Sequence, residues 1–102
     1  MPTTEEVLQY LGIDYADTVI TANVNRALAT ARQTLRGAVG DDVEQLLPDD
    51  PRVKELVLIY TDDLYSNRGV GAKVSAAVRR MVGIMELQLR LELRRAREAV
   101  QS

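Results

Sequence analysis

Acidic side chains are the residues of this sequence that could catalyse a reaction or bind a metal ion. They occur as adjacent pairs at four places: Glu5-Glu6, Asp41-Asp42, Asp49-Asp50 and Asp62-Asp63. Paired carboxylates can act as general acid and base, or can hold a divalent cation. Adjacent residues of a helix point about 100° apart, however, so Asp62 and Asp63 are not expected to converge on one substrate. The pairs in loops are typical of helix caps and turns.

The residue types that the sequence lacks limit its chemistry further. None of the 102 residues is His or Cys, which removes the commonest general base, thiolate ligands and disulfide bonds. The segment that contains Gly69 and Gly71 has neither the third glycine nor the preceding strand that a phosphate-binding loop requires. We therefore expect a protein that is not an enzyme and has neither metal nor cofactor. A hydrolase or nuclease accessory that uses Asp62 and Asp63 is the least favoured alternative.

Charge is divided unequally along the sequence. Residues 1–72 contain six Lys/Arg and twelve Asp/Glu, a net charge of −6, whereas residues 73–102 contain seven and three, a net charge of +4. Such a division favours head-to-tail contact between the acidic part of one copy and the basic end of a neighbour.

The length and composition predict one domain built from packed helices. Apolar residues make up 46% of the chain and charged residues 27%, which is ordinary for a globular protein. The only aromatic residues are four tyrosines, so aliphatic side chains must fill the core. No apolar run is long enough to span a membrane, and the acidic start has no resemblance to a signal peptide.

Hydrophobic spacing and end signals place the first two helices. Thr3 and Glu6 fit a capping box at the start of a short helix, and Gly12 fits its end. A second helix begins near Asp17 or Thr18 and carries a helical stripe of mostly small apolar residues for about five turns. Residues 40–50 form an acidic connector with at most one irregular turn.

Two further helices follow the connector. Asp50-Pro51 starts the third, which stops at Gly69, and Ser75 caps a fourth that continues to Ser102. The expected fold is all-α: a small four-helix domain with a short N-terminal helix, two long antiparallel helices and a long C-terminal helix. A single domain covers residues 1–102, and residues 73–102 form a basic helix that can extend beyond the core.

The C-terminal helix carries two apolar stripes on opposite sides. The inner stripe consists of Val78, Met81, Val82, Met85, Leu89, Leu93, Ala96 and Val100. The outer stripe consists of Ala77, Ile84, Leu87 and Leu91. A helix packed on one domain needs one apolar stripe, and an apolar surface left in water marks an interface. We therefore predict that Ile84, Leu87 and Leu91 contact a partner; the alternative is a helix enclosed by its own chain.

Arginines lie along one edge between the two stripes. A basic run near a helix C-terminus is most often a solvated face, because positive charge is favourable there. With the division of charge, Arg90, Arg94 and Arg97 favour contact with an acidic protein surface. The runner-up function is a small helical DNA-binding or regulatory protein, which is less favoured because the basic patch has no interleaved aromatic residues.

Asn67-Arg68 ends the third predicted helix. A local role is favoured here, in which Asn67 satisfies the last carbonyls and Arg68 pairs with Asp62, Asp63 or the acidic connector. An intersubunit contact is the alternative.

Three segments together resemble a known family. The opening Thr3–Ile13, with its Leu11-Gly12-Ile13-Asp14 turn, is similar to the start of tailed-phage head–tail connector proteins, also called adaptor or head-completion proteins. The segment from Asp50 to Asn67-Arg68 resembles that family's second long helix with its Asn-Arg ending. Residues 77–93 resemble the last helix of one branch. Residues 86–102 depart from the pattern, because they are longer and more basic than the usual ending.

The resemblance implies a structural protein of the virion. Family members form a ring, typically of about twelve copies, beneath the portal protein at the capsid vertex. The ring extends the DNA channel, lies close to channel DNA without reading its sequence, and receives the tail or a stopper protein. The C-terminal helix or tail of each subunit engages the portal. Such proteins are sometimes called DNA-packaging proteins, and they assemble in the host cytoplasm without a membrane.

Overall fold

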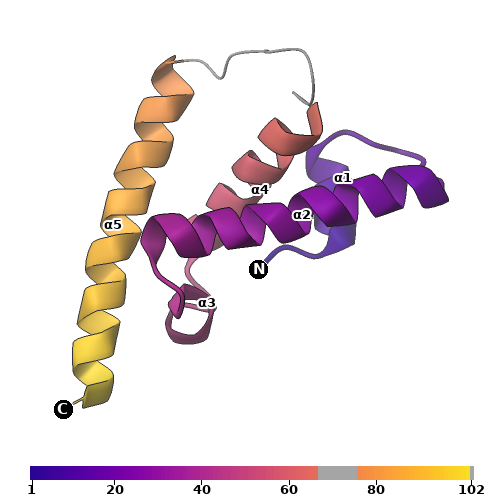
Figure 1. Cartoon of the computed structure of the whole chain (residues 1–102). Coiled ribbons are helices and arrows are strands. Elements are labelled where there is room, and N and C mark those ends of the chain that lie inside the picture. Colours follow the sequence, from indigo (N-terminus) through magenta and orange to yellow (C-terminus); the bar gives the residue numbers. More distant parts are fainter. Residues whose placement is uncertain (67–75, 102) are drawn as a thin grey trace.

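The computed structural model describes residues 1–66 and 76–101, and these form helices without any strand (Figure 1). The helices are α1 Thr4–Tyr10, α2 Thr18–Val39, α3 Val43–Leu46, α4 Pro51–Ser66 and α5 Ala76–Gln101. The all-α class and the four predicted helices are therefore confirmed. The difference lies in the connector, which contains the four-residue helix α3. The predicted stop at Gly69 and cap at Ser75 lie outside the described residues.

Side-chain caps set the starts of α1, α2 and α4. The Thr3 hydroxyl accepts a bond from the Glu6 N–H, and the Glu6 carboxylate accepts one from the Thr3 N–H, which completes the predicted capping box. Asp17 accepts from the N–H of Ile20 at 2.8 Å, so α2 begins one residue after Asp17. Asp50 likewise accepts from the N–H of Arg52, directly after Pro51.

The two long helices α2 and α4 form the body of the molecule. They share its most extensive contact and run in roughly opposite directions, while α1 packs against both (Figure 1). Helix α5 crosses the body at the end where α2 finishes and contacts α2, α3 and α4. The result is an elongated molecule of 48 × 29 × 18 Å.

Aliphatic side chains fill the core, as the composition predicts. The larger cluster joins α2, α3, α4 and α5, with Leu35, Leu56, Leu89 and Leu93 fully buried. A smaller cluster joins α1, α2 and α4 through Val7, Val24 and Leu58. Because α5 supplies two of the largest buried side chains, it belongs to the core and is not a free arm.

Some residues that the helical spacing assigns to inner faces are exposed. Met81 and Val100 of the predicted inner stripe are 45% and 71% exposed, whereas Val82 and Met85 pack against the core. A 26-residue helix is about 39 Å long, so α5 projects beyond the part of the body that covers it. Leu64 is also partly exposed, because it lies in the last turn of α4.

None of the helices in the described ranges has the length and apolar content of a membrane span.

Candidate assembly surface

One side of α5 exposes three large aliphatic side chains. Ile84 and Leu87 are each 51% exposed and Leu91 is 47% exposed, whereas Leu89 and Leu93 are completely buried. The two sets lie about half a turn apart on the helix, so α5 packs on the body with one face and presents the other to solvent. We call Ile84, Leu87 and Leu91 the outer face.

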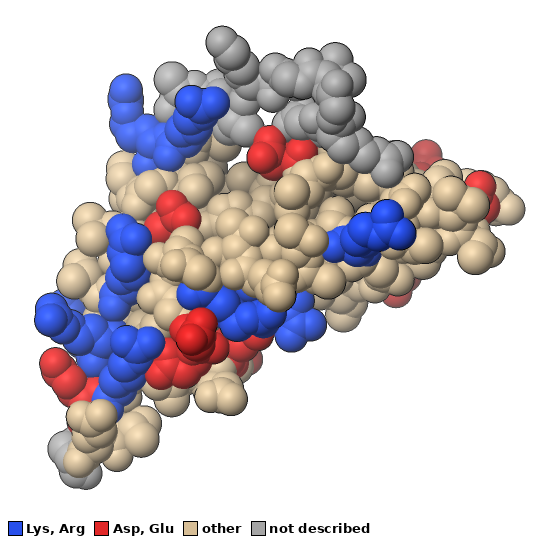
Figure 2. Space-filling view, in the orientation of Figure 1, with Lys and Arg blue, Asp and Glu red and all other residues tan. Residues whose placement is uncertain are grey.

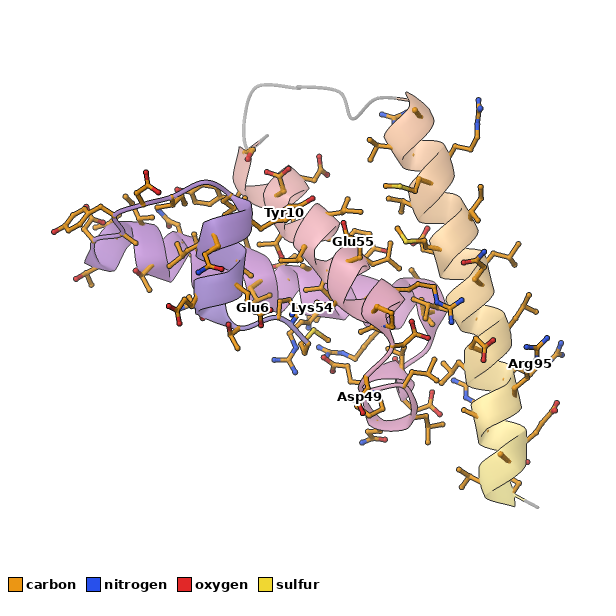
Figure 3. The ribbon with its side chains drawn as sticks, turned by 180° about the vertical axis from the view of Figure 1, so that it is seen from behind. Glu6, Tyr10, Asp49, Lys54, Glu55 and Arg95 are labelled. Atoms are coloured by element: carbon orange, nitrogen blue, oxygen red, sulfur yellow. The ribbon has the colours of Figure 1, made fainter. Side chains whose placement is uncertain are left out.

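Arginine side chains lie on the solvent-facing side of α5. Figure 3 shows Arg95 on the side of α5 that points away from the body. Arg80, Arg94 and Arg95 are all exposed, and their spacing places them on or beside the outer face. The outer face is therefore an apolar strip beside three arginines, of which Arg95 also pairs with Glu92 at 3.2 Å.

The N-terminal half of α5 widens this surface. A shallow hollow there is lined by Ala77, Arg80, Met81, Ile84 and Met85. The sequence-based assignment placed Met81 on the inner stripe and so missed its part in the exposed surface. The signal that could have found it is its angular position, at the border between the two stripes.

Two of the three predicted interface arginines have partners within their own chain. Arg90 donates from Nη1 to the carbonyl oxygen of Ala38 at 3.2 Å. This carbonyl is in the last turn of α2, where backbone acceptors have no partner within the helix. Arg97 binds both carboxylate oxygens of Asp42. Arg94, the third, is exposed on α5, and its role at an interface stays a prediction.

A hydrogen bond between α4 and α5 adds to this attachment. The Tyr60 hydroxyl donates to Glu86 Oε2 at 2.8 Å. Burial of the ring, together with this bond to the carboxylate, raises the pKa of Tyr60 well above its usual range. The phenol therefore keeps its proton and acts as a donor that holds α5 against α4.

Several acidic side chains form ion pairs between segments of the fold. Glu6 pairs with Lys54 across α1 and α4, and Figure 3 shows these side chains pointing toward each other. Glu44 receives bonds from Arg32 at 2.8 Å and Arg36 at 2.7 Å. Burial raises the pKa of Glu44, but the two guanidinium groups outweigh burial and hold this pKa below its usual value.

The carboxylates Asp62 and Asp63 face different neighbours. Asp62 accepts a bond from the Ser66 hydroxyl, whereas Asp63 lines a groove between α4 and α5 together with Arg79. Residues 1–66 and 76–101 contain no cluster of three acidic side chains that could hold a metal ion. Asn67 and Arg68 lie outside the described residues.

Comparison with family models, curated proteins and solved structures finds no match to this chain. Its function must therefore be argued from the geometry of α5 and from the resemblance of its sequence segments.

Proposed function

We propose that this chain is a structural subunit of a tailed-phage virion, a head–tail connector. In this proposal several copies form a ring beneath the portal, extend the DNA channel and receive the tail or a stopper protein. A ring of about twelve copies is the size that the family resemblance implies.

The observation that carries the proposal is the outer face of α5. Fully burying an aliphatic side chain of this size is worth about 1.5–3 kcal/mol, and Ile84, Leu87 and Leu91 are each about half exposed. Exposed apolar strips with polar rims are typical of surfaces that bind other proteins. Leu89 and Leu93 anchor the opposite side of α5 in the core, so the helix does not have to fold on assembly, which reduces the entropy lost.

The positions of the arginines give less support to the alternative of DNA binding. Arg90 and Arg97 are two of the basic residues that could contact phosphates in that alternative, but here they bind Ala38 and Asp42. Neutralising fewer phosphates lowers the affinity for a duplex.

The proposal is tested by mixing the purified chain with the portal protein of the same genome. We expect native mass spectrometry to detect a complex and negative-stain imaging to show rings on the portal. The variant Leu87→Glu/Leu91→Glu should stay helical and lose this binding. The matched control is Ala29→Glu/Gln33→Glu, which adds the same charges at exposed positions of α2 with the same spacing.

A chain that never binds portal would defeat the proposal. Salt-dependent binding to duplex DNA in place of portal binding would favour the regulatory alternative. Unfolding of Leu87→Glu/Leu91→Glu would show that the outer face belongs to the core.

A further inference from the structure

The acidic side chains that remain exposed are distributed unevenly. Residues 1–25 contain four acidic residues and no Lys or Arg. Glu6 is paired with Lys54, which leaves Glu5, Asp14 and Asp17 exposed, and the last two lie in the segment that leads into α2. Asp17 caps α2 with one carboxylate oxygen, and this bond leaves its negative charge in place. The start of the chain is therefore a surface of negative charge.

The same end exposes large apolar side chains. Tyr15, in the segment that leads into α2, is 82% exposed, and Val19, in the first turn of α2, is 67% exposed. We call residues 14–19 the tip. The connection 40–50, which the structure describes throughout, also has exposed acids at Asp41 and Asp49 but exposes no large hydrophobic side chain. The tip thus combines the two properties that a partner of the outer face needs.

The tip and the outer face lie at opposite ends of the body. Helix α2 begins at the tip and ends beside α5, where Ala38 receives the bond from Arg90 (Figure 1). Its 22 residues span about 33 Å. Figure 2 shows Lys and Arg gathered over α5 and acidic side chains at the far end of α2. The two surfaces consequently point in opposite directions.

We propose that the outer face of α5 in one copy packs against the tip of the next copy. This inference rests on the proposed connector function and identifies the second surface of the contact between subunits. Tyr15 and Val19 would cover Leu87 and Leu91, while Asp14 and Asp17 lie near Arg80, Arg94 and Arg95. A contact between two different surfaces repeats from copy to copy, so it builds a ring or a filament instead of a closed dimer.

The size of the two surfaces determines how strongly free copies associate. A standard stable interface buries about 800 Å² on each partner, and three half-exposed aliphatic side chains supply only part of that area. The polar rims must therefore contribute, and association of free copies is weak and depends on concentration. Opposite charges at the rims also fix the direction of the contact, because two α5 helices would bring arginines together.

A complementation experiment tests the two surfaces. Tyr15→Glu/Val19→Glu blocks the tip and leaves the outer face intact, whereas Leu87→Glu/Leu91→Glu blocks the outer face and leaves the tip intact. In sedimentation velocity, we expect the unchanged chain to grow with concentration and each variant alone to remain monomeric. An equal mixture of the two variants should form dimers that grow no further, because only one productive contact is possible.

Cross-linking tests the same contact independently. The chain has no Cys of its own, so an introduced Cys is the only thiol that can react. We expect a short bismaleimide to join Tyr15→Cys to Leu87→Cys in a mixture, and neither variant to itself. Linkage of Leu87→Cys to itself would overturn the proposal in favour of a symmetric α5 contact. Absence of any linkage at the highest attainable concentration would also overturn it.

The two proposals fail in different ways. If the tip variant still forms rings on the portal, the tip contact is wrong and the connector function stands. If the unchanged chain does not bind portal but Tyr15→Cys and Leu87→Cys still link, the connector function is wrong and the contact between copies stands.

Discussion

Arg97 and Asp42 form a bidentate ion pair although they are 55 positions apart in the sequence. Arg97 Nη2 lies 2.6 Å from Asp42 Oδ1, and Arg97 Nε lies 2.9 Å from Asp42 Oδ2. Parallel bonds of this kind fix the direction as well as the distance of a guanidinium group. The pair ties the C-terminal half of α5 to the short connection between α2 and α3.

Loss of this pair should loosen the end of α5 more than it lowers overall stability. Both side chains are partly exposed, so Arg97→Gln should lower the melting temperature only slightly. Amide exchange in the turns after Leu93 should increase, because the ion pair lies beyond that buried anchor. Adding Asp42→Asn to Arg97→Gln should change little further, and unchanged exchange in both variants would contradict this assignment.

The two faces of α5 should respond differently to truncation. Leu89→Ala removes a fully buried side chain, and we expect it to lower the free energy of unfolding by about 2–5 kcal/mol. Leu87→Ala should change it by no more than about 0.5 kcal/mol in the monomer. Urea unfolding measured by circular dichroism compares them, and equal losses would show that α5 is docked differently.

Two glycines, one inside α2 and one at its end, provide a second matched comparison. Gly40 has φ +154°, and a Cβ there would lie 2.5 Å from Leu93 Cδ2 and 2.7 Å from Arg97 Nη2. We expect Gly40→Ala to destabilise the fold by about 1–3 kcal/mol. Gly37 lies inside α2 with open space around it, so Gly37→Ala should stabilise by up to about 1 kcal/mol. Thermal melting checks both, and a neutral Gly40→Ala would mean that Leu93 moves freely.

Acid should destabilise the protein. Arg97 lowers the pKa of Asp42, and Lys54 lowers the pKa of Glu6. Carboxylates with lowered pKa values bind fewer protons in the folded chain, so they stabilise it above the unfolded values of 3.8 and 4.5. This contribution disappears as the pH falls through the lower folded values. The melting temperature should therefore decrease below about pH 4, and less steeply in Arg97→Gln.

The parts of the fold that the sequence predicted depend on residues close together in the chain. The bonds between Thr3 and Glu6, and between Asp17 and Ile20, each span three residues, so the starts of α1 and α2 could be recognised directly. The burial of Leu89 and Leu93 followed from helical spacing alone. The four residues of α3 were missed as a helix because a single turn has too short a pattern to stand out in an acidic, Pro-containing segment.

The remaining features depend on contacts between distant segments. Nothing near Arg90 or Arg97 in the sequence indicates that they reach Ala38 and Asp42, so these two partners could not be predicted. The exposure of Met81 depends on where the body ends beneath α5, which helical spacing cannot give. Tyr15 and Val19 were overlooked because neither belongs to a periodic stripe.

The opposite exposure of Leu89 and Leu87 also determines how tolerance to substitution should vary along α5. A saturation library scored for folding alone should tolerate polar residues at Ile84, Leu87 and Leu91 and reject them at Leu89 and Leu93. The same library scored for particle formation should reject them on both faces. Subtracting one profile from the other would outline the contact surface at single-residue resolution, whichever molecule covers it.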